Sequence, residues 1–452
     1  MSPTYIVIII YFVLILWLAR FFSRRESIQD YFINSRSSSL WLLVFSNVAT
    51  LVWAGAVVTT VSEVYSTWIS FWITNLASMV FGAILMAIFA PKMFEFWKKY
   101  WIYNVVDFFA KRFDKKNQII ALILQLLLLL IWTTLQIVAI GFLISALSGI
   151  SYMLSLVIAM LFTIVYTSLW WLKIDIITDF IQFWIILIVL ILMAIFGYNE
   201  IGSFSNLMAQ LPSANLNVFS FWWVGFFVWT ILFGALIYLP NSAHRQRILS
   251  AKNVSVAKNS YYLSFPFILL MMLIIIFLWL LATIFLWDVP KDTAVFELMK
   301  HMFSNKWLLW LGFACVLAVI MSSIDSLLVA WSTIIYTWLF KDRESNNKKR
   351  IWFARLLTSW FGLICLVLAI LVPDMVTLAL FVAYLALIFV PAIIAGLYWS
   401  KTSANASFYS ILIPTIVLAL GYIPVWKNIF VITTLLAILI ILFYDKIFRK
   451  WK

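Results

Sequence analysis

The stretch AVIMSSIDSLLVAW, residues 318–331, places two adjacent serines, an aspartate and a third serine inside an otherwise apolar run. Positions i, i+3 and i+4 share one face of a helix, so Ser322, Asp325 and Ser326 would face the same way, with Ser323 beside them. Hydrocarbon offers no hydrogen-bond partner, and each polar group would need a partner inside the protein or a bound ligand. The stretch therefore predicts a buried polar site, provided that the surrounding chain spans a membrane.

The chain has the composition of an integral membrane protein. Of its 452 residues, 66% are hydrophobic and 11% are charged, and the mean hydropathy is +1.09. Runs of about 20 apolar residues span a bilayer as helices, and these runs lack the alternation typical of a transmembrane β-barrel. We therefore predict an all-α polytopic membrane protein of about thirteen transmembrane helices, at 5–22, 40–64, 66–91, 118–146, 150–170, 176–197, 219–239, 261–287, 307–338, 352–372, 375–398, 405–423 and 428–445.

The net charge of +14 reflects membrane topology rather than a surface for nucleic acid. Of the 31 Lys and Arg residues, all but four fall in loops on one side of the predicted membrane. Loops rich in Lys and Arg lie in the cytoplasm. This places the N-terminus outside and the C-terminus in the cytoplasm. The four exceptions, in the outer loops, are Lys291, Lys300, Lys306 and Lys427.

Two of the predicted helices contain residues that interrupt helices. FSNVATLVWAGAVVTTVSEVY (45–65) has polar groups and Gly55 near its middle, and VWTILFGALIYLPNSAHRQR (228–247) has Gly234 and Pro240. These helices are five apart in order and would run in opposite directions. Paired broken helices at matching places indicate the binding site of a transporter. The alternative is that glycine and proline are simply commoner in membrane helices.

Five stretches of the chain resemble motifs of the sodium/solute symporter family. The family patterns are E-D-Y-F-x-x-G-R-S, Y-T-x-x-G-G-x-x-A-V-x-x-T-D-x-x-Q, Q-R-x-L-A-A-K, A-A-x-M-S-(S/T)-x-D-S-x-L and P-x-x-x-G-L-x-W. The matching stretches, in the same order, are SIQDYFINSRSSSLWLL (27–43), YTSLWWLKIDIITDFIQ (166–182), HRQRILSAKN (244–253), LAVIMSSIDSLL (317–328) and FVPAIIAGLYWSKTSANA (389–406). The chain departs from the family at Ser35, Trp170 and Trp171, where the motifs have glycine, and at Leu51, where many members have Glu.

The resemblance implies one transporter domain over residues 1–452, with two inverted five-helix repeats at 40–197 and 219–398. Helix 1 (5–22) and helices 12 and 13 (405–445) would flank them. It implies sodium-driven secondary active transport of a small organic solute across a prokaryotic plasma membrane. The expected partners are the solute, sodium and the bilayer, with no cofactor beyond the coupling ion; the oligomeric state is left open.

The resemblance also implies a sodium site on the opening stretch. In the family, the two hydroxyls of the M-S-(S/T) pair and nearby backbone carbonyls hold one sodium ion. Sodium is a hard cation that prefers such oxygen ligands, as calcium does. The corresponding groups here are the hydroxyls of Ser322 and Ser323 and the carbonyls of Val319, Phe45 and Val48. The alternative is that these serines bond to carbonyls of the preceding turn or pack helices together.

A second ion position or proton path is expected at Asp179. In some relatives the matching aspartate joins the serine face, which here includes Asp325 and Ser326. Two carboxylates inside a bilayer would repel each other unless a cation or proton lay between them. Lys173 and Asp175, by contrast, are expected to form an ordinary surface pair at the inner membrane boundary.

The resemblance places the solute at mid-membrane, beside the two broken helices. Trp132 resembles an aromatic residue of the choline-transporter branch, where it binds a quaternary ammonium by a cation–π contact, but that branch also carries Trp at the positions of Leu51 and Asn241. Asn241 matches an Asn of the sugar-transporting members. We expect an amino acid such as proline or a pantothenate-like carboxylate first, choline or a betaine second, and a sugar third. The candidate residues are Asn47, Trp53, Trp132, Gln136, Tyr238 and Asn241.

Three other functions were weighed against sodium symport. A membrane enzyme needs a cluster of catalytic groups, but His244 falls in a basic inner loop and His301 in an outer loop, so no enzyme is predicted. A transporter-like sensor or partner-binding protein would keep the fold without transport. A proton-coupled transporter would require Asp179 and tolerate loss of the serines.

The stretch VVDFFAKRFDKK (105–116) predicts a short helix at the cytoplasmic interface.

Overall fold

The structure is a computed structural model, and its described parts are almost entirely helical. It describes residues 28–52, 69–168, 172–212, 233–286, 293–303, 305–340, 348–372, 375–422 and 429–448, with a few isolated residues between them. Nine helices within these parts are long and apolar enough to cross a membrane. This confirms the prediction of an all-α polytopic membrane protein. Most of the predicted first span (5–22) and much of the second and seventh lie outside the described residues.

The described helices divide between the two halves of the chain. In the first half they are α2 (Ile28–Ile33), η1 (Asn34–Arg36), α3 (Leu40–Leu51), α5 (Ile69–Tyr100), α6 (Val105–Arg112), α7 (Lys115–Ser148), α8 (Tyr152–Ser168), α9 (Leu172–Ile201) and α10 (Phe204–Gln210). In the second half they are η4 (Gly234–Tyr238), α12 (Ser242–Ser250), α13 (Val254–Phe285), α14 (Ala294–Met302), α15 (Lys306–Leu339), α16 (Lys348–Leu371), α17 (Met375–Tyr398), α18 (Ala404–Tyr422) and α19 (Ile429–Phe448).

The helix starts follow from local sequence. Asn and Asp side chains accept a backbone N–H that the first turn leaves without a partner. Asp114 accepts from the N–H of Asn117 at the start of α7, and Asn253 accepts from that of Val256 at the start of α13. Helix α15 runs from 306 to 339, and the predicted span was 307–338. The two ranges agree because the same continuous apolar run sets the length of the helix and of the predicted span.

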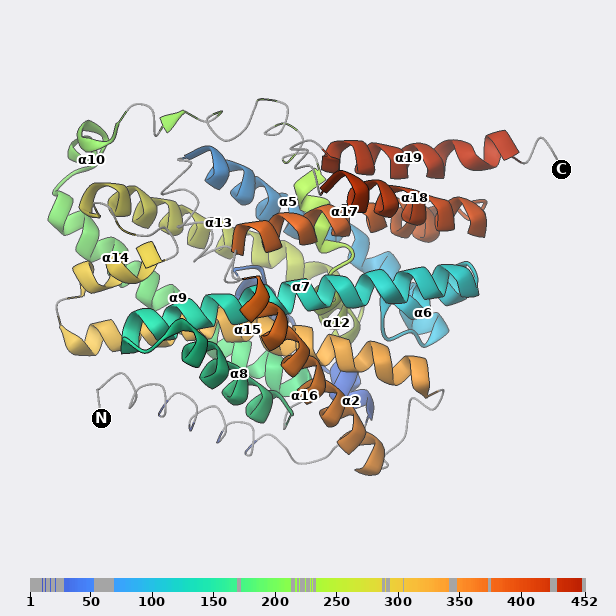
Figure 1. Cartoon of the computed structure of the whole chain (residues 1–452), viewed down its shortest axis with the longest axis horizontal. Coiled ribbons are helices and arrows are strands. Elements are labelled where there is room, and N and C mark those ends of the chain that lie inside the picture. Colours follow the sequence, from blue (N-terminus) through green and yellow to red (C-terminus); the bar gives the residue numbers. More distant parts are fainter. Residues whose placement is uncertain are drawn as a thin grey trace.

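The long helices pack as two groups joined by α9. Helices α3, α5 and α13 pack mainly with one another and with η4, while α7, α8, α15 and α16 pack mainly with one another. Helix α9 contacts α3 and α13 of the first group and α15 of the second. Figure 1 shows α18 and α19 at one edge of the molecule, beside α17. Each group combines helices from both halves of the chain.

The short helix predicted within 105–116 is present as α6, and its apolar residues pack against protein. Phe108 and Phe109 are fully buried. The ring of Phe108 stacks on that of Trp97, with centroids 4.9 Å apart, and Phe109 contacts Phe389. The apolar face of α6 is therefore covered by protein, and its burial explains the aromatic residues that suggested lipid contact.

A left-handed turn and a short backbone bridge set the position of α12. Asn34, Ser35 and Arg36 have φ angles of 47°, 43° and 56°. After this turn, Ser38 accepts a hydrogen bond from the N–H of Lys252, and its own N–H donates to the carbonyl of Ser250. The segment before α3 is thereby joined to the end of α12, which places α12 inside the bundle.

Candidate functional site

Ser322 lies where α15 meets the last turn of α3. Its hydroxyl oxygen is 3.0 Å from the carbonyl oxygen of Ala49 and 2.9 Å from that of Val319. A hydroxyl has one proton and can donate to only one of these carbonyls at a time. The last carbonyls of a helix also lack intrahelical partners. Three oxygens from two helices thus converge at one buried point, which is the kind of ligand set that a hard cation prefers.

Ser323 stands beside this point with an unused hydroxyl. Its side chain is buried, and its hydroxyl oxygen has no hydrogen-bond partner among the described residues. Buried polar groups without a partner are uncommon and call for an explanation. Ser323 also lines the pocket that contains most of the candidate solute residues, and it is the direct chain neighbour of Ser322.

The two other candidate carbonyls lie earlier in α3. The carbonyl of Val48 accepts a hydrogen bond of 2.8 Å from the N–H of Val52. The ring of Phe45 packs among other aromatic rings, with its centroid 4.6 Å from that of Phe183. The carbonyl that touches Ser322 is that of Ala49, one residue beyond Val48. Ala49 was not among the sequence candidates.

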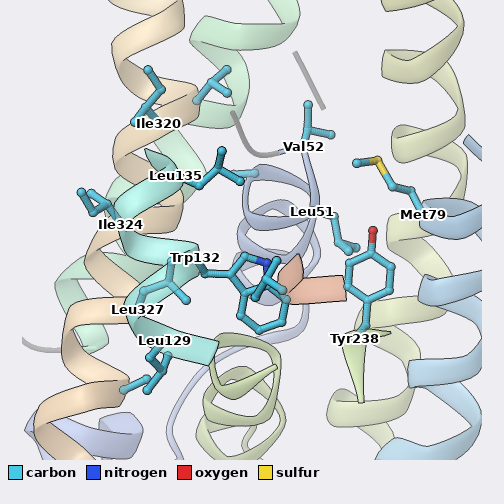
Figure 2. Packing of buried hydrophobic residues seen from close by; sticks show 14 of the residues in the cluster. Leu51, Val52, Met79, Leu129, Trp132, Leu135, Tyr238, Ile320, Ile324 and Leu327 are labelled. Atoms are coloured by element: carbon cyan, nitrogen blue, oxygen red, sulfur yellow. The ribbon is translucent and has the colours of Figure 1, made fainter. Parts of the chain in front are cut away.

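Four of the six solute candidates line one pocket between α7, α15 and the η4–α12 segment. They are Trp132, Gln136, Tyr238 and Asn241. Figure 2 shows the side chains of Trp132 and Tyr238 extending from separate elements toward the region around Leu51. The pocket has a volume of about 30 Å³, which holds one or two water molecules. A cavity of this size does not admit an organic solute.

The remaining two candidates lie elsewhere. The side-chain amide of Asn47 donates to the hydroxyl of Ser260 at 3.2 Å, which links α3 to α13, and Asn47 does not line the pocket. Trp53 lies outside the described residues. Ser323, predicted as a sodium ligand, also lines the pocket. Sequence reasoning missed the other lining residues, because their proximity depends on how distant helices pack: Thr50, Ile237, Ala243, His244 and Leu327.

His244 lies in a helix and not in the basic inner loop that the sequence predicted. It is 1% exposed and lies on α12, whose residues are all buried. Its ring packs against Tyr238, with centroids 5.3 Å apart, and its Nδ1 lies 3.3 Å from the hydroxyl of Tyr261. The basic character of the sequence around it concealed this burial, since Arg245 and Arg247 are buried as well.

Asp179 is the centre of a buried ionic cluster with Arg247. A terminal nitrogen (Nη2) of Arg247 is 2.5 Å from Oδ2 of Asp179 and 2.9 Å from the hydroxyl oxygen of Ser326. The Nε of Arg247 donates to the hydroxyl of Ser46, which itself donates to Asp179. Side chains from α3, α9, α12 and α15 therefore meet at one guanidinium.

Asp175 belongs to this cluster and is not part of a surface pair. It is 1% exposed, its Oδ2 accepts a 2.7 Å hydrogen bond from Ser326, and the same oxygen lies 3.7 Å from Nη2 of Arg247. Lys173, its expected partner, is exposed. A signal was available in the sequence. The family motif has valine at this position, so the chain carries a charge where the family carries an apolar residue.

Asp325 is buried on α15 but does not bond to Asp179. It is 2% exposed, whereas the hydrogen bonds of the Asp179 carboxylate go to Ser46 and Arg247. The structure thus brings Asp179 and Ser326 together through Arg247, a residue that sequence reasoning had placed in the inner loop. The arginine of the Q-R-x-L-A-A-K motif was the available signal.

Arg245 has a different set of partners. It donates to the carbonyls of Leu239 and Pro240, at 2.9 and 2.6 Å, and to the side chains of Gln125 and Ser242. The two carbonyls belong to the turn between η4 and α12, where helical bonding is interrupted at Pro240. Arg245 therefore satisfies backbone groups that the break exposes.

The fold and the site together define a class: a multi-pass helical membrane protein with a buried, oxygen-lined position beside a small pocket. The chain belongs to the sodium:solute symporter family, whose family model matches residues 31–414. No curated protein matches the sequence at a significant level.

Solved transporter structures share the fold. A Na⁺-coupled sialic acid symporter, in a substrate-bound outward-open state, has a TM-score of 0.79 at 16% identity, with 98% of both chains covered. Mhp1, a nucleobase-cation-symport-1 family transporter in a closed conformation with bromovinylhydantoin bound, has a TM-score of 0.64 at 13% identity, covering 92% of this chain and 94% of its own. A manganese transporter of Eremococcus coleocola has a TM-score of 0.52 at 14% identity, covering 92% and 95%. At these identities the likeness concerns the fold alone.

Proposed function

We propose that this protein is a secondary active transporter that couples sodium to the uptake of a small organic solute by alternating access. Ser323 carries the proposal. Its buried hydroxyl has no partner in the described part of the chain, borders the pocket, and adjoins Ser322, whose hydroxyl meets carbonyls of two helices. An ion held by the two hydroxyls and the carbonyls of Ala49 and Val319 would join α3 to α15 next to the solute. Carbonyls of Phe45 and Val48 in α3 are further ligands in this proposal.

Ion binding at this place would couple to opening because α3 and α15 belong to different helix groups. A ligand can shift a conformational equilibrium only by its differential affinity for the two states. Oxygens contributed by both groups bind a cation together only when the groups are close. Sodium would therefore favour one arrangement of the groups, and its release would favour the other.

The membrane arrangement is part of the same proposal. The chain would cross a prokaryotic plasma membrane thirteen times, with the N-terminus outside, and residues 40–197 and 219–398 would form the inverted repeats. The packing supports this arrangement: α3 and α5 group with α13, while α7 and α8 group with α15 and α16, so each group takes helices from both proposed repeats.

The solute is proposed to be an amino acid such as proline or a pantothenate-like carboxylate. The described lining of the pocket contains no Asp, Glu, Lys or Arg. The negative group of such a solute would therefore depend on the neighbouring sodium ion. Choline or a betaine is the second candidate, because the rings of Trp132 and Tyr238 line the same pocket and aromatic faces bind quaternary ammonium groups.

The test is a thermal melt of the purified protein, titrated with Na⁺ against K⁺ at constant ionic strength. A ligand that binds only the folded state raises the melting temperature as its concentration passes its affinity. We expect a sodium-specific rise that is lost in Ser322→Ala and Ser323→Ala. Ser332→Ala is the matched control, because this buried serine of α15 bonds to the carbonyl of Val329 in its own helix.

The absence of any sodium-specific rise in the wild type, at several pH values, would contradict sodium coupling. A positive result is followed by the same melt in sodium with proline, pantothenate, choline and glycine betaine. Only the true solute class should add a further rise. We expect Trp132→Ala to remove that rise while leaving the sodium response in place, since Trp132 lines the pocket but supplies no oxygen to the proposed ion site.

A further inference from the structure

The point expected to hold a second ion is occupied by a side chain of the protein. Oxygens of Asp179, Ser326 and Asp175 converge on Nη2 of Arg247, at 2.5, 2.9 and 3.7 Å. Asp179 and Ser326 are two of the groups that the sequence assigned to a second ion position or proton path. A metal ion placed between these oxygens would overlap the guanidinium nitrogen and be repelled by its charge.

We propose that Arg247 is a built-in cation at the second ion position, so that of the two expected ion positions only the one at Ser322 and Ser323 exchanges sodium. The part of this inference that concerns the number of coupled sodium ions rests on the proposed function. The occupation of the site by a guanidinium rests on the contacts of Arg247 alone. An arginine suits this role because its charge is permanent and its planar fork donates several hydrogen bonds at fixed angles.

Asp175 makes the cluster favour a cation more strongly than one ion pair would. Asp175 and Asp179 lie four residues apart on one face of α9. With both carboxylates ionised, the two aspartates and one guanidinium would carry one excess negative charge. One oxygen of each carboxylate, Oδ1, has no hydrogen-bond partner among the residues that the structure describes. A positive group is thus held tightly at this place, and its loss would leave two neighbouring buried negative charges.

The excess negative charge also lies close to the proposed sodium site. Ser326 and Ser322 are one helical turn apart on α15. A negative charge in a medium of low dielectric constant attracts a nearby cation more strongly than it would in water. The cluster would therefore favour one monovalent cation at Ser322 and Ser323 while leaving no place for a second beside Asp179.

The experiment removes the side-chain cation and offers a free one. Arg247→Ala is purified and melted with millimolar guanidinium, far below denaturing concentrations, and with tetramethylammonium as a cation that donates no hydrogen bond. We expect guanidinium to give a saturable rise in melting temperature in Arg247→Ala and none in the wild type. Arg245→Ala is the matched control, because it loses the same side chain on the same helix without leaving a carboxylate.

A second variant covers failure of Arg247→Ala to fold. The double variant Asp175→Asn/Arg247→Ala removes one charge of each sign and keeps the excess of one negative charge. It is expected to show the same guanidinium-specific rise. No rise in either variant, or an equal rise in Arg245→Ala, would overturn the proposal.

Equilibrium binding of radioactive sodium gives the ion count. We expect one sodium per wild-type protein, lost in Ser323→Ala; two sodium ions in the presence of Arg247 would also overturn the proposal. If the wild type binds no sodium while guanidinium still rescues Arg247→Ala, the proposed sodium coupling fails and the built-in cation stands. The two conclusions are therefore separable.

Discussion

Arg245 and Arg247 lie two residues apart on α12 and are both buried, yet they bond to different kinds of group. Arg245 donates to backbone carbonyls and to uncharged side chains around the η4–α12 turn. Arg247 bonds to a carboxylate and two hydroxyls contributed by α3, α9 and α15. Burial alone does not define the role of an arginine in this bundle. The charge of the partners distinguishes the two roles. Arg245, which bonds to neutral groups, holds backbone carbonyls in place and is called a backbone clamp here, whereas Arg247, which bonds to a carboxylate, serves as a fixed cation.

The largest expected effect is the difference between the two arginines themselves. Arg247→Leu leaves Asp175 and Asp179 buried without their cation and should cost about 3–5 kcal/mol of stability. Arg245→Leu leaves neutral acceptors without a donor and should cost about 1–3 kcal/mol. Chemical unfolding in detergent compares the two. Equal losses of stability in the two variants would contradict the distinction between the arginines, since they would mean that the carboxylates contribute nothing to the effect of losing Arg247.

The two aspartates of α9 are expected to differ in their contributions to stability. Asp179→Val removes the nearest partner of Arg247 and should cost about 3 kcal/mol or more. Asp175→Val should cost less than about 1 kcal/mol, because Arg247 keeps Asp179 and the excess negative charge disappears. Combining each change with Arg247→Leu in a double-mutant cycle measures the two couplings. A larger coupling for Asp175 than for Asp179 would contradict the assignment of partners.

A third arginine tests the clamp role in a more exposed setting. Arg112 donates to the carbonyls of Gly396, Trp399 and Ser400 at the end of α17. Partial burial lowers the pKa of Arg112, and arginine nonetheless stays protonated in proteins. Arg112→Ala should cost about 1–2 kcal/mol. Its exposed neighbour offers the control Lys111→Ala, for which no measurable change is expected in the same melt.

The smallest expected effect concerns the turn that leads toward α12. Ser35 has a φ of 43°, where glycine is favoured over residues with a Cβ atom. Ser35→Gly, which restores the family residue, should stabilise the protein by about 1 kcal/mol. Ser37→Gly should not, because Ser37 has a φ of −111° and its hydroxyl bonds to Asn34. A loss of stability in Ser35→Gly would show that the serine side chain has a necessary contact.

The sequence predicted much of the fold because hydropathy is a local property. Helix α17 has the bounds predicted for its span, and α15 differs by one residue at each end. The α6 helix was also predicted, but its surroundings were not, because aromatic residues suit lipid and protein interiors equally. Of the site, the motifs supplied Ser322, Ser323 and Asp179, while Ala49 and His244 required knowledge of which helices touch.

The class of protein, the course of its long helices, the family and the serine pair could all be read from the sequence, since each depends on neighbouring residues or on a motif. Which charges meet could be seen only in the folded chain. Arg247 lies 68 residues from Asp179, 79 from Ser326 and 201 from Ser46. Sequence showed one basic loop and one surface aspartate there. In the folded chain Arg247, Asp175 and Asp179 form a buried cluster, because a charge removed from water is stable only beside a partner that the fold brings to it.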